Sequence, residues 1–232
     1  MSGTLYVVSV PIGNLEDITL RALRILKEVD IIAAEDTRHT RKLLSHYDIH
    51  TPMISYFEHN ETQRDKTLLQ KLESGDNIAL VPDSGTPAIS DPGYTIIKAC
   101  IDAGINIVPI PGPSSVIAAV VVSGFPLHNF VFEGFPSQKH SGRMKKLRSL
   151  VDEKRTMIFF ESTHRLVKFL NDMLEVFGDR DIVIANDITK FFEEIYRGSV
   201  NSAIEKYTEN QPKGEFTIVV KGSLEKENEN HK

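Results

Sequence analysis

Turns rich in proline, glycine, aspartate and serine are the parts of this sequence best suited to binding chemistry. The stretch PDSGTPAISDPG, residues 82–93, stands between two apolar segments, and shorter turns of the same kind occur near residues 11 and 111. Each turn directly follows an apolar run that predicts a strand. Because ligands bind at the carboxyl ends of strands in open parallel sheets, we expect the three turns to meet at one crevice.

The residue types in these turns narrow the choice of ligand. None of the turns fits GxGxxG or GxxxxGK[ST], and their prolines lack the backbone N–H groups that a phosphate cradle uses. Their side chains are acidic or hydroxylic, which favours a ligand that bears hydroxyls and an amine and has no phosphate. S-adenosylmethionine fits this description. The alternative is that these residues are simply the types commonly found in turns, and that Asp91 caps a helix beginning at Pro92.

The expected S-adenosylmethionine site takes residues from all three turns. It consists of Pro11, Ile12, Gly13, Asp83, Thr86, Ser114 and Ser115. Asp83 is expected to accept hydrogen bonds from hydroxyl or amine groups of the cofactor. We expect no metal, because the single Cys100 and the scattered histidines show no ligand spacing for zinc.

Strands and helices alternate through the first half of the chain and would position these turns. Strands are predicted at Leu5–Val10, Ile31–Ala34, Met53–Phe57, Ile78–Val81 and Ile105–Ile110. Helices are predicted at Ile18–Val29, Thr37–Tyr47, Glu61–Ser74 and Pro92–Ala103, and from Ser114 onward. Short links between alternating elements imply a mostly parallel sheet with helices on both faces.

The turn-rich passage SGFPLHNF then interrupts the pattern, and we place a domain boundary near Pro126. Beyond it, strands are predicted at Phe130–Phe135, Met157–Phe160, Ile182–Ala185, Glu194–Arg197 and Phe216–Val220, and helices at Arg143–Leu150, Arg165–Phe177 and Ser199–Thr208. Fewer crossover helices per strand predict a mixed sheet. The sequence therefore predicts an α/β protein with an N-terminal lobe (1–125), a C-terminal lobe (126–222) and a polar, disordered tail (223–232).

Composition limits the class of protein. With 232 residues, 41% hydrophobic and 25% charged, the chain is long enough for two soluble globular lobes. No apolar run approaches a membrane span, and the lone cysteine suits a reducing cytoplasm. A net charge of −5 means that a nucleic-acid partner would need a local basic patch.

Several segments together resemble a known family. They are VSVPIGNLEDITLRAL, AAEDTRHTRKLL, PDSGTPAISDPG, PIPGPSS, VFEGFPSQK, FFESTHRL and GEFTIVVKG, and they run in order from about residue 4 to residue 221. The sequence resembles the ribosomal RNA small subunit methyltransferase I family, which has the tetrapyrrole-methylase fold. The resemblance implies a homodimeric enzyme that binds S-adenosylmethionine between its lobes. Its implied reaction is 2′-O-methylation of a 16S rRNA cytidine in the decoding region of the small ribosomal subunit.

The sequence departs from the family pattern at a few positions. Thr163 stands where proline is expected in ESTHR, and Asn186 and Asp187 replace an expected arginine and glutamate. Two other functions remain open. One is a small-molecule methyltransferase that acts on a tetrapyrrole, and the other is a non-catalytic, RNA-binding assembly factor.

Two basic segments could bind RNA phosphates in this acidic protein. The expected RNA contacts are Arg41 and Lys42 in the first segment, and Lys139, Arg143, Lys145 and Lys146 in the second. The alternative for a run of lysine and arginine on a helix is a solvated face.

A ribose methyltransferase also needs groups that position the 2′-hydroxyl and help to remove its proton. We expect Glu35, Asp36 and Arg38 to fill this role, because they follow the second predicted strand. The alternative is that Asp36 or Thr37 caps the following helix. Glu161, at the end of a strand in the second lobe, is the other candidate base and is also expected near the cofactor.

Overall fold

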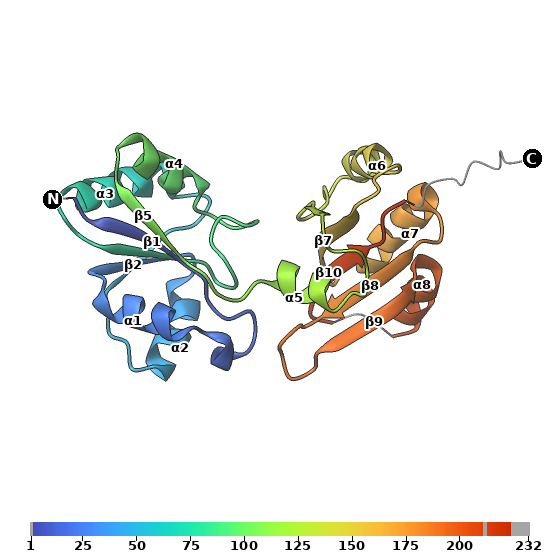
Figure 1. Ribbon diagram of the computed structural model, residues 1–232, viewed down its shortest axis with the longest axis horizontal. Helices are drawn as coiled ribbons and strands as arrows, with labels where there is room; N and C mark the ends of the chain where they lie inside the picture. Colours follow the sequence, from blue (N-terminus) through green and yellow to red (C-terminus); the bar gives the residue numbers. More distant parts are fainter. Residues whose placement is uncertain (1, 211–212, 224–232) are drawn as a thin grey trace, which may run out of the picture. The chain divides into compact units, whose positions relative to one another are not determined.

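The strands form two separate sheets of five, one in each half of the chain (Figure 1). The computed structural model describes residues 2–210 and 213–223. Contacts divide the chain into two units, Met1–Ser114 and Ser115–Lys232. The sequence-based boundary near Pro126 lies inside the second unit, after the helix α5 (Ser115–Val121). Residues 224–232 of the predicted tail lie outside the described residues.

The first sheet is parallel throughout. Its strands are β1 (Thr4–Val8), β2 (Ile31–Ala34), β3 (Met53–Ser55), β4 (Ile78–Val81) and β5 (Asn106–Ile110). They lie in the order β3-β2-β4-β1-β5. The helices of this unit are α1 (Leu20–Glu28), α2 (Thr37–His46), α3 (Glu61–Glu73) and α4 (Tyr94–Asp102).

Alternating side chains of this sheet build two apolar cores. In β2, Ile32 and Ala34 join α1 and α2 in one core, whereas Ala33 joins α3 and α4 in the other. This period of two is what a strand buried on both faces requires. Figure 1 shows the result, with α3 and α4 on one side of the sheet and α1 and α2 on the other.

The strand order creates a switch point at β4. The connections through α1 and α2 move toward the β3 edge, whereas those through α3 and α4 move back toward β5. Crossovers of one hand that run in opposite directions must lie on opposite faces of a sheet. The loops that leave β4 and its neighbours β1 and β2 therefore diverge, and such a point is where ligands bind in open parallel sheets.

The second sheet is mixed. Its strands are β6 (Phe130–Phe132), β7 (Thr156–Ser162), β8 (Asp181–Asn186), β9 (Glu194–Ser199) and β10 (Glu215–Val220), in the order β6-β7-β10-β8-β9. Among its described residues, β6 and β7 are paired in parallel, and the other neighbouring strands are paired antiparallel. Helices α6 (His140–Ser149), α7 (Leu166–Phe177) and α8 (Val200–Glu209) build a core on one face. The predicted fold class, a parallel sheet followed by a mixed one, is confirmed.

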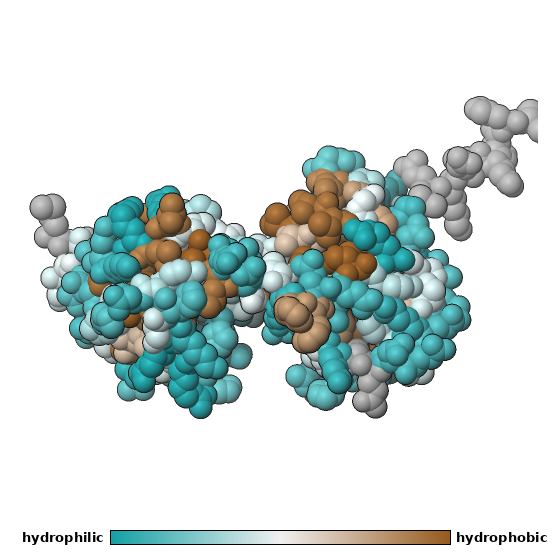
Figure 2. Space-filling model, turned by 90° about the horizontal axis from the view of Figure 1, so that it is seen from below, coloured by the Kyte–Doolittle hydropathy of each residue, from teal (hydrophilic) through white to brown (hydrophobic). Residues whose placement is uncertain are grey.

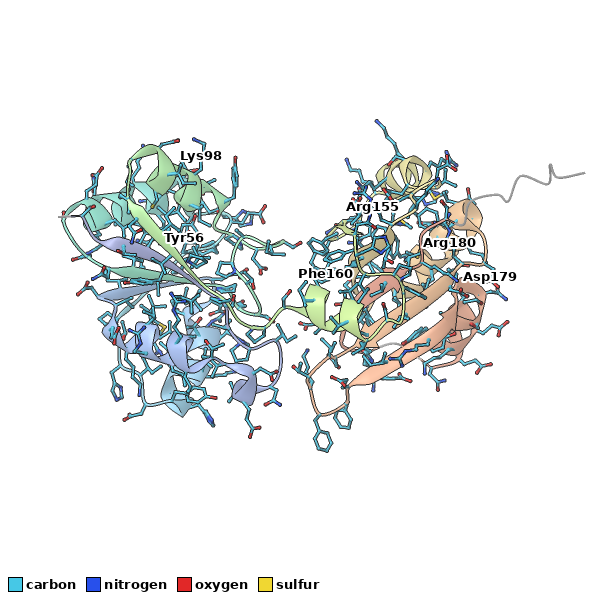
Figure 3. The ribbon with its side chains drawn as sticks, viewed as in Figure 1. Tyr56, Lys98, Arg155, Phe160, Asp179 and Arg180 are labelled. Atoms are coloured by element: carbon cyan, nitrogen blue, oxygen red, sulfur yellow. The ribbon has the colours of Figure 1, made fainter. Side chains whose placement is uncertain are left out.

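The opposite face of the second sheet is covered by α5 and by aromatic side chains. Val116, Ala119 and Val120 of α5 pack against strands β7, β8 and β10. Phe160 of β7, labelled in Figure 3, has ring-centroid distances of 4.9 Å to Phe132 and 5.3 Å to Phe135. Because α5 belongs to this core, the second unit begins before the turn-rich passage.

Local capping explains one difference from the predicted elements. The sequence predicts a helix over Ile18–Val29, but Leu15–Asp17 form a 3-10 turn and α1 begins at Leu20. Thr19 adopts an extended backbone, and its side chain accepts a hydrogen bond from the backbone N–H of Ala22. This N-cap fixes the start of the helix.

The face seen in Figure 2 is mostly hydrophilic, with apolar residues gathered in patches on each unit. In the parts of the chain that the structure describes, no helix combines the length and the apolar content needed to cross a bilayer.

Candidate active site

The three predicted turns meet at the carboxyl ends of β1, β4 and β5. Val10 donates a backbone hydrogen bond of 2.8 Å to the carbonyl of Gly85, and Gly85 donates one of 3.2 Å in return. The hydroxyl of Thr86 lies 2.9 Å from that of Ser9 and 3.4 Å from the carbonyl oxygen of Pro113. The predicted convergence of the turns is confirmed within the first unit.

Glycine permits the backbones of these turns to approach closely. A Cβ atom on Gly112 would lie 2.9 Å from the Cβ of Ser9 and 3.3 Å from its carbonyl oxygen. Gly85 has a φ of +74°, which side chains disfavour. A side chain at position 112 would push the turns apart, and one at position 85 would strain the backbone.

Beside this junction, the ends of β2 and β4 are joined by two reciprocal hydrogen bonds. The backbone N–H of Asp36 donates to Oδ1 of Asp83 over 2.9 Å. The backbone N–H of Asp83 donates to Oε2 of Glu35 over 3.2 Å. The expected catalytic motif and an expected cofactor residue are therefore in direct contact.

Asp36 is the N-cap of α2. Its carboxylate accepts a hydrogen bond of 2.8 Å from the backbone N–H of Arg38 and two more from the Arg38 guanidinium, at 3.1 and 2.7 Å. The guanidinium bonds, followed by the backbone bond, hold the pKa of Asp36 well below its ordinary value. A carboxylate of such low pKa is a weak base, so of the two roles considered for Asp36 the geometry supports the cap.

The pKa values of Glu35 and Asp91 are raised, in contrast to that of Asp36. Burial raises the pKa of Glu35, and the nearby carboxylates of Asp83 and Asp36 also raise it, against the hydrogen bond from the Asp83 backbone. Burial, and then the charges of Glu35 and Asp83, raise the pKa of Asp91 to about 7. Asp91 does not cap α4, which begins at Tyr94 with Gly93 as its N-cap, so that prediction was wrong.

A small cavity of about 40 Å³ opens at the same edge of the sheet. Its lining consists of Val10, Pro11, Leu15, His39, Thr40, Leu43, Val81, Pro82 and Asp83. Thr40 is only 1% exposed, and its hydroxyl has no hydrogen-bond partner among the described residues. The cavity therefore offers an unpaired hydroxyl on α2 between two of the turns.

The remaining expected cofactor residues in the turns have different surroundings. Ile12 is buried and Gly13 is exposed after the first turn. Ser114 ends the first unit, and Ser115 is the first residue of α5. Both serines are partly exposed.

Glu161 lies in the second unit and is 2% exposed. It shares the helix-covered side of β7 with Met157 and Phe159. One of its oxygens lies 3.1 Å from the Arg165 guanidinium, and the other accepts a hydrogen bond of 2.8 Å from the N–H of Ser162. Because no surface of this carboxylate is open, we leave Glu161 out of the proposed site.

The second basic segment forms α6, and part of its charge is held inside the unit. Arg143 is 7% exposed, forms an ion pair with Asp172 of α7, and donates to the carbonyls of Ser137 and Gln138. Lys146 forms an ion pair with Glu133. Arg143 is closed to a phosphate in this arrangement, which corrects its predicted role, whereas Lys139 and Lys145 are exposed.

Several residues at the carboxyl ends of the strands in the first unit were not predicted from the sequence to belong to the site. His39 and Thr40 line the cavity, and Ser9 bridges to Thr86. The position of Ser9 directly after the first strand was a usable signal. Thr40 had none, because one threonine within a helix usually faces neither ligand nor cavity.

Relatives of this chain carry a consistent name. "Ribosomal RNA small subunit methyltransferase I" of Synechocystis is 50% identical over 95% of this chain and 80% of its own length. The protein of that name from Thermotoga maritima is 48% identical over 95% of this chain and 99% of its own. The family model described as Tetrapyrrole (Corrin/Porphyrin) Methylases matches residues 4–204. The chain belongs to the ribosomal RNA small subunit methyltransferase I family.

Solved structures show that members of the wider fold family are similar in three dimensions. A diphthine synthase has a TM-score of 0.72 at 15% identity, covering 96% of this chain and 91% of that one. Uroporphyrin-III C-methyl transferase from Thermus thermophilus, complexed with S-adenosyl homocysteine, has a TM-score of 0.65 at 20% identity, covering 94% of this chain and 97% of that one. At these identities the likeness establishes the fold.

The departures from the pattern of the methyltransferase I family have local structural roles. The hydroxyl of Thr163 donates a hydrogen bond of 2.6 Å to the carbonyl of Gly214, which proline could not do. Asp187 has a φ of +46° and accepts hydrogen bonds from the N–H of Glu215 and the ammonium of Lys190. Asn186 ends β8 in register with Phe216. Thr163 thus joins the end of β7 to the start of β10, whereas Asn186 and Asp187 join the end of β8 to β10.

Proposed function

We propose that this chain transfers a methyl group from S-adenosylmethionine to the 2′-hydroxyl of a cytidine in the decoding region of 16S rRNA. Its support is the family: relatives of 45–50% identity over 95–98% of the chain are named ribosomal RNA small subunit methyltransferases. One structural observation carries the proposal. At the switch point of the first sheet, three turns that lack a phosphate-binding motif meet beside the hydrogen bonds that join Glu35, Asp36 and Asp83.

S-adenosylmethionine is the cofactor, and it supplies a methyl group activated by a positively charged sulfur. The residues that would hold it are Pro11, Ile12, Gly13, Thr86, Ser114 and Ser115, whereas the Asp83 carboxylate is engaged by the backbone N–H of Asp36. The donor set fits this group, because the charges of Glu35 and Asp83 raise the pKa of Asp91, and a positively charged ligand would relieve this repulsion between carboxylates. Among the described residues no group of three or more potential ligands is placed to hold a metal ion.

The residues of the β2 end would act on the acceptor hydroxyl. Glu35 is the proposed base, since burial raises its pKa toward neutrality and makes it a better proton acceptor than Asp36. A positioned base contributes about 10²–10⁴-fold to such a reaction. Arg38, held by Asp36 with its side chain 88% exposed, would bind the phosphate beside the reacting ribose. Alignment of the two reactants can supply roughly 7–11 kcal/mol more.

The proposed RNA contacts differ in the two units. In the first unit, Arg41 and Lys42 on α2 are exposed and make no ion pair with any described residue. In the second unit, Lys139 and Lys145 are exposed and are retained from the α6 segment, whereas the exposed Lys146 is paired with Glu133. The proposal includes a cytoplasmic location, where small ribosomal subunits assemble, and a homodimer. Light scattering on the purified protein tests the dimer and should report the mass of two chains.

Mass mapping of 16S rRNA from cells with and without this chain tests the proposal. We expect one 2′-O-methylated cytidine fragment to lose 14 mass units when the gene is deleted and to regain them on complementation. Identical 16S rRNA maps would contradict rRNA methylation. In that case, methyl transfer to a tetrapyrrole would favour the small-molecule enzyme, and failure to bind S-adenosylhomocysteine would favour the assembly factor.

A further inference from the structure

We infer that Asp83 is a positioning residue: its carboxylate orients the Glu35–Asp36 turn for methyl transfer, and S-adenosylmethionine is bound without it. The inference rests on the proposed function and assigns to Asp83 a role different from that of a cofactor ligand. Its basis is the pair of hydrogen bonds that joins the ends of β2 and β4.

These two bonds continue the strand pairing after the strands have ended. The last paired residues of β2 and β4 are Ala34 and Val81, and the N–H of Glu35 still donates to the carbonyl of Val81 over 3.2 Å. One step further, side chains replace the backbone as acceptors, since Glu35 accepts from Asp83 and Asp83 accepts from Asp36. The register of the sheet is thereby extended into two loops.

The Asp83 carboxylate also fixes the groups that follow Asp36. Its bond to the N–H of Asp36 orients the N-cap residue of α2, and the Asp36 carboxylate in turn holds the backbone and guanidinium of Arg38. A shift at Asp83 would therefore move the proposed base Glu35 and the proposed phosphate contact Arg38 together. Misplacement of reacting groups by about 1 Å can lower a rate by ~10²-fold.

The same contacts use two of the polar groups with which Asp83 could bind a cofactor. Its N–H donates to Glu35, and its Oδ1 accepts from Asp36. The charges of Glu35 and Asp83 also raise the pKa of Asp91. The two hydrogen bonds between the ends of β2 and β4 require from the Asp83 side chain only an acceptor oxygen at the right distance. Neither bond requires the negative charge of Asp83.

Three substitutions separate positioning from cofactor binding. Asp83→Asn keeps an acceptor oxygen in place, Asp83→Glu keeps the charge but moves the oxygens by one methylene, and Asp83→Ala removes both. Ser84→Ala, at the exposed next residue, is the matched control. Each variant is measured for single-turnover methylation of small ribosomal subunits at saturating cofactor, for S-adenosylhomocysteine affinity by calorimetry, and for thermal unfolding.

Positioning predicts that Asp83→Asn methylates within about threefold of the unsubstituted protein, whereas Asp83→Glu and Asp83→Ala are slower by ~10²-fold. The dissociation constant for S-adenosylhomocysteine should change less than threefold in all variants. A cofactor affinity lowered tenfold or more in Asp83→Asn, or a rate as low in Asp83→Asn as in Asp83→Glu, would overturn the inference. If Asp83→Ala does not fold, the comparison of Asp83→Asn with Asp83→Glu still distinguishes positioning from cofactor binding. Failure of the unsubstituted protein to methylate would instead contradict the proposed function.

Discussion

The two units use charged side chains differently, and their basic helices α2 and α6 show this most clearly. Both helices contain several lysines and arginines without an interleaved acid. On α2, Arg41 and Lys42 extend from the surface and have no ion-pair partner in the described chain. On α6, Arg143 is buried against Asp172, and Lys146 and Arg148 form ion pairs with Glu133 and Glu175.

The carboxylates show the same contrast. In the first unit, burial and the charges of Glu35 and Asp83 raise the pKa of Asp91, and burial and the charge of Asp83 raise the pKa of Glu35. In the second unit, Glu161 is buried beside Arg165, and Asp172 beside Arg143 and His140. Buried pairs give a unit its structure, whereas unpaired charges at a strand edge are typical of a binding site. This contrast supports the proposal that the reaction takes place at the first unit.

Removal of a buried partner on α6 should have the largest effect. Arg143→Ala leaves Asp172 buried without its cation, so we expect the free energy of unfolding to fall by about 3–5 kcal/mol. Denaturant unfolding measures this fall. Lys145→Ala, on the exposed side of the same helix, is the matched control and should change the free energy by less than about 0.5 kcal/mol. Normal stability together with a lowered RNA affinity in Arg143→Ala would contradict this prediction, because it would show that Arg143 binds RNA and does not stabilise the fold.

Charge reversal on α2 should weaken RNA binding without affecting the cofactor. In Arg41→Glu/Lys42→Glu, two lost phosphate contacts should flatten the dependence of log affinity on log salt by about two units of slope. The affinity for S-adenosylhomocysteine should stay the same. The measurement is RNA binding across a salt series. The matched control is Lys146→Glu on α6, whose cation is already paired with Glu133. An unaltered slope in the α2 variant would make this helix a solvated face.

The unpaired hydroxyl of Thr40 should lower stability slightly. Thr40→Val keeps the shape of the side chain and removes a buried, unpartnered polar group, so we expect the free energy of unfolding to rise by about 1 kcal/mol. Thermal unfolding with and without S-adenosylhomocysteine measures this. A stability loss in Thr40→Val would instead show that the hydroxyl has a partner, such as a water molecule in the cavity.

The crowded carboxylates should make stability depend on pH. Folding raises the pKa of Asp91 to about 7, so its protonated form is favoured in the folded state. Stability from this group is fully present below the unfolded pKa near 4 and is lost as pH rises toward 7. Asp91→Asn removes this loss. Its unfolding midpoint should exceed that of the unsubstituted protein at pH 8, and the difference should shrink toward pH 5. A constant difference across this range would contradict the carboxylate cluster.

The sequence predicts most of the fold because its signals are local. Strand–helix alternation and turn residues define both sheets, and the carboxyl-end rule predicts that Val10, Gly85 and Pro113 come together. The burial of Arg143 could not be predicted in this way, because its partner Asp172 lies on another helix and a local charge count does not include it. The alternation along β7 places Glu161 with Met157 and Phe159, but only the fold reveals that α7 covers this side.

In the proposed reaction, the strand edge of the first unit transfers a methyl group to a ribose of 16S rRNA. The most direct measurement is incubation of the purified chain with small ribosomal subunits and S-adenosylmethionine labelled in its methyl group, followed by nuclease digestion and mass spectrometry of nucleosides. We expect label in 2′-O-methylcytidine from 16S rRNA. We expect this label to be lost when the Glu35→Gln variant is used. Label on a base, or no RNA label from a protein that binds S-adenosylhomocysteine, would contradict it.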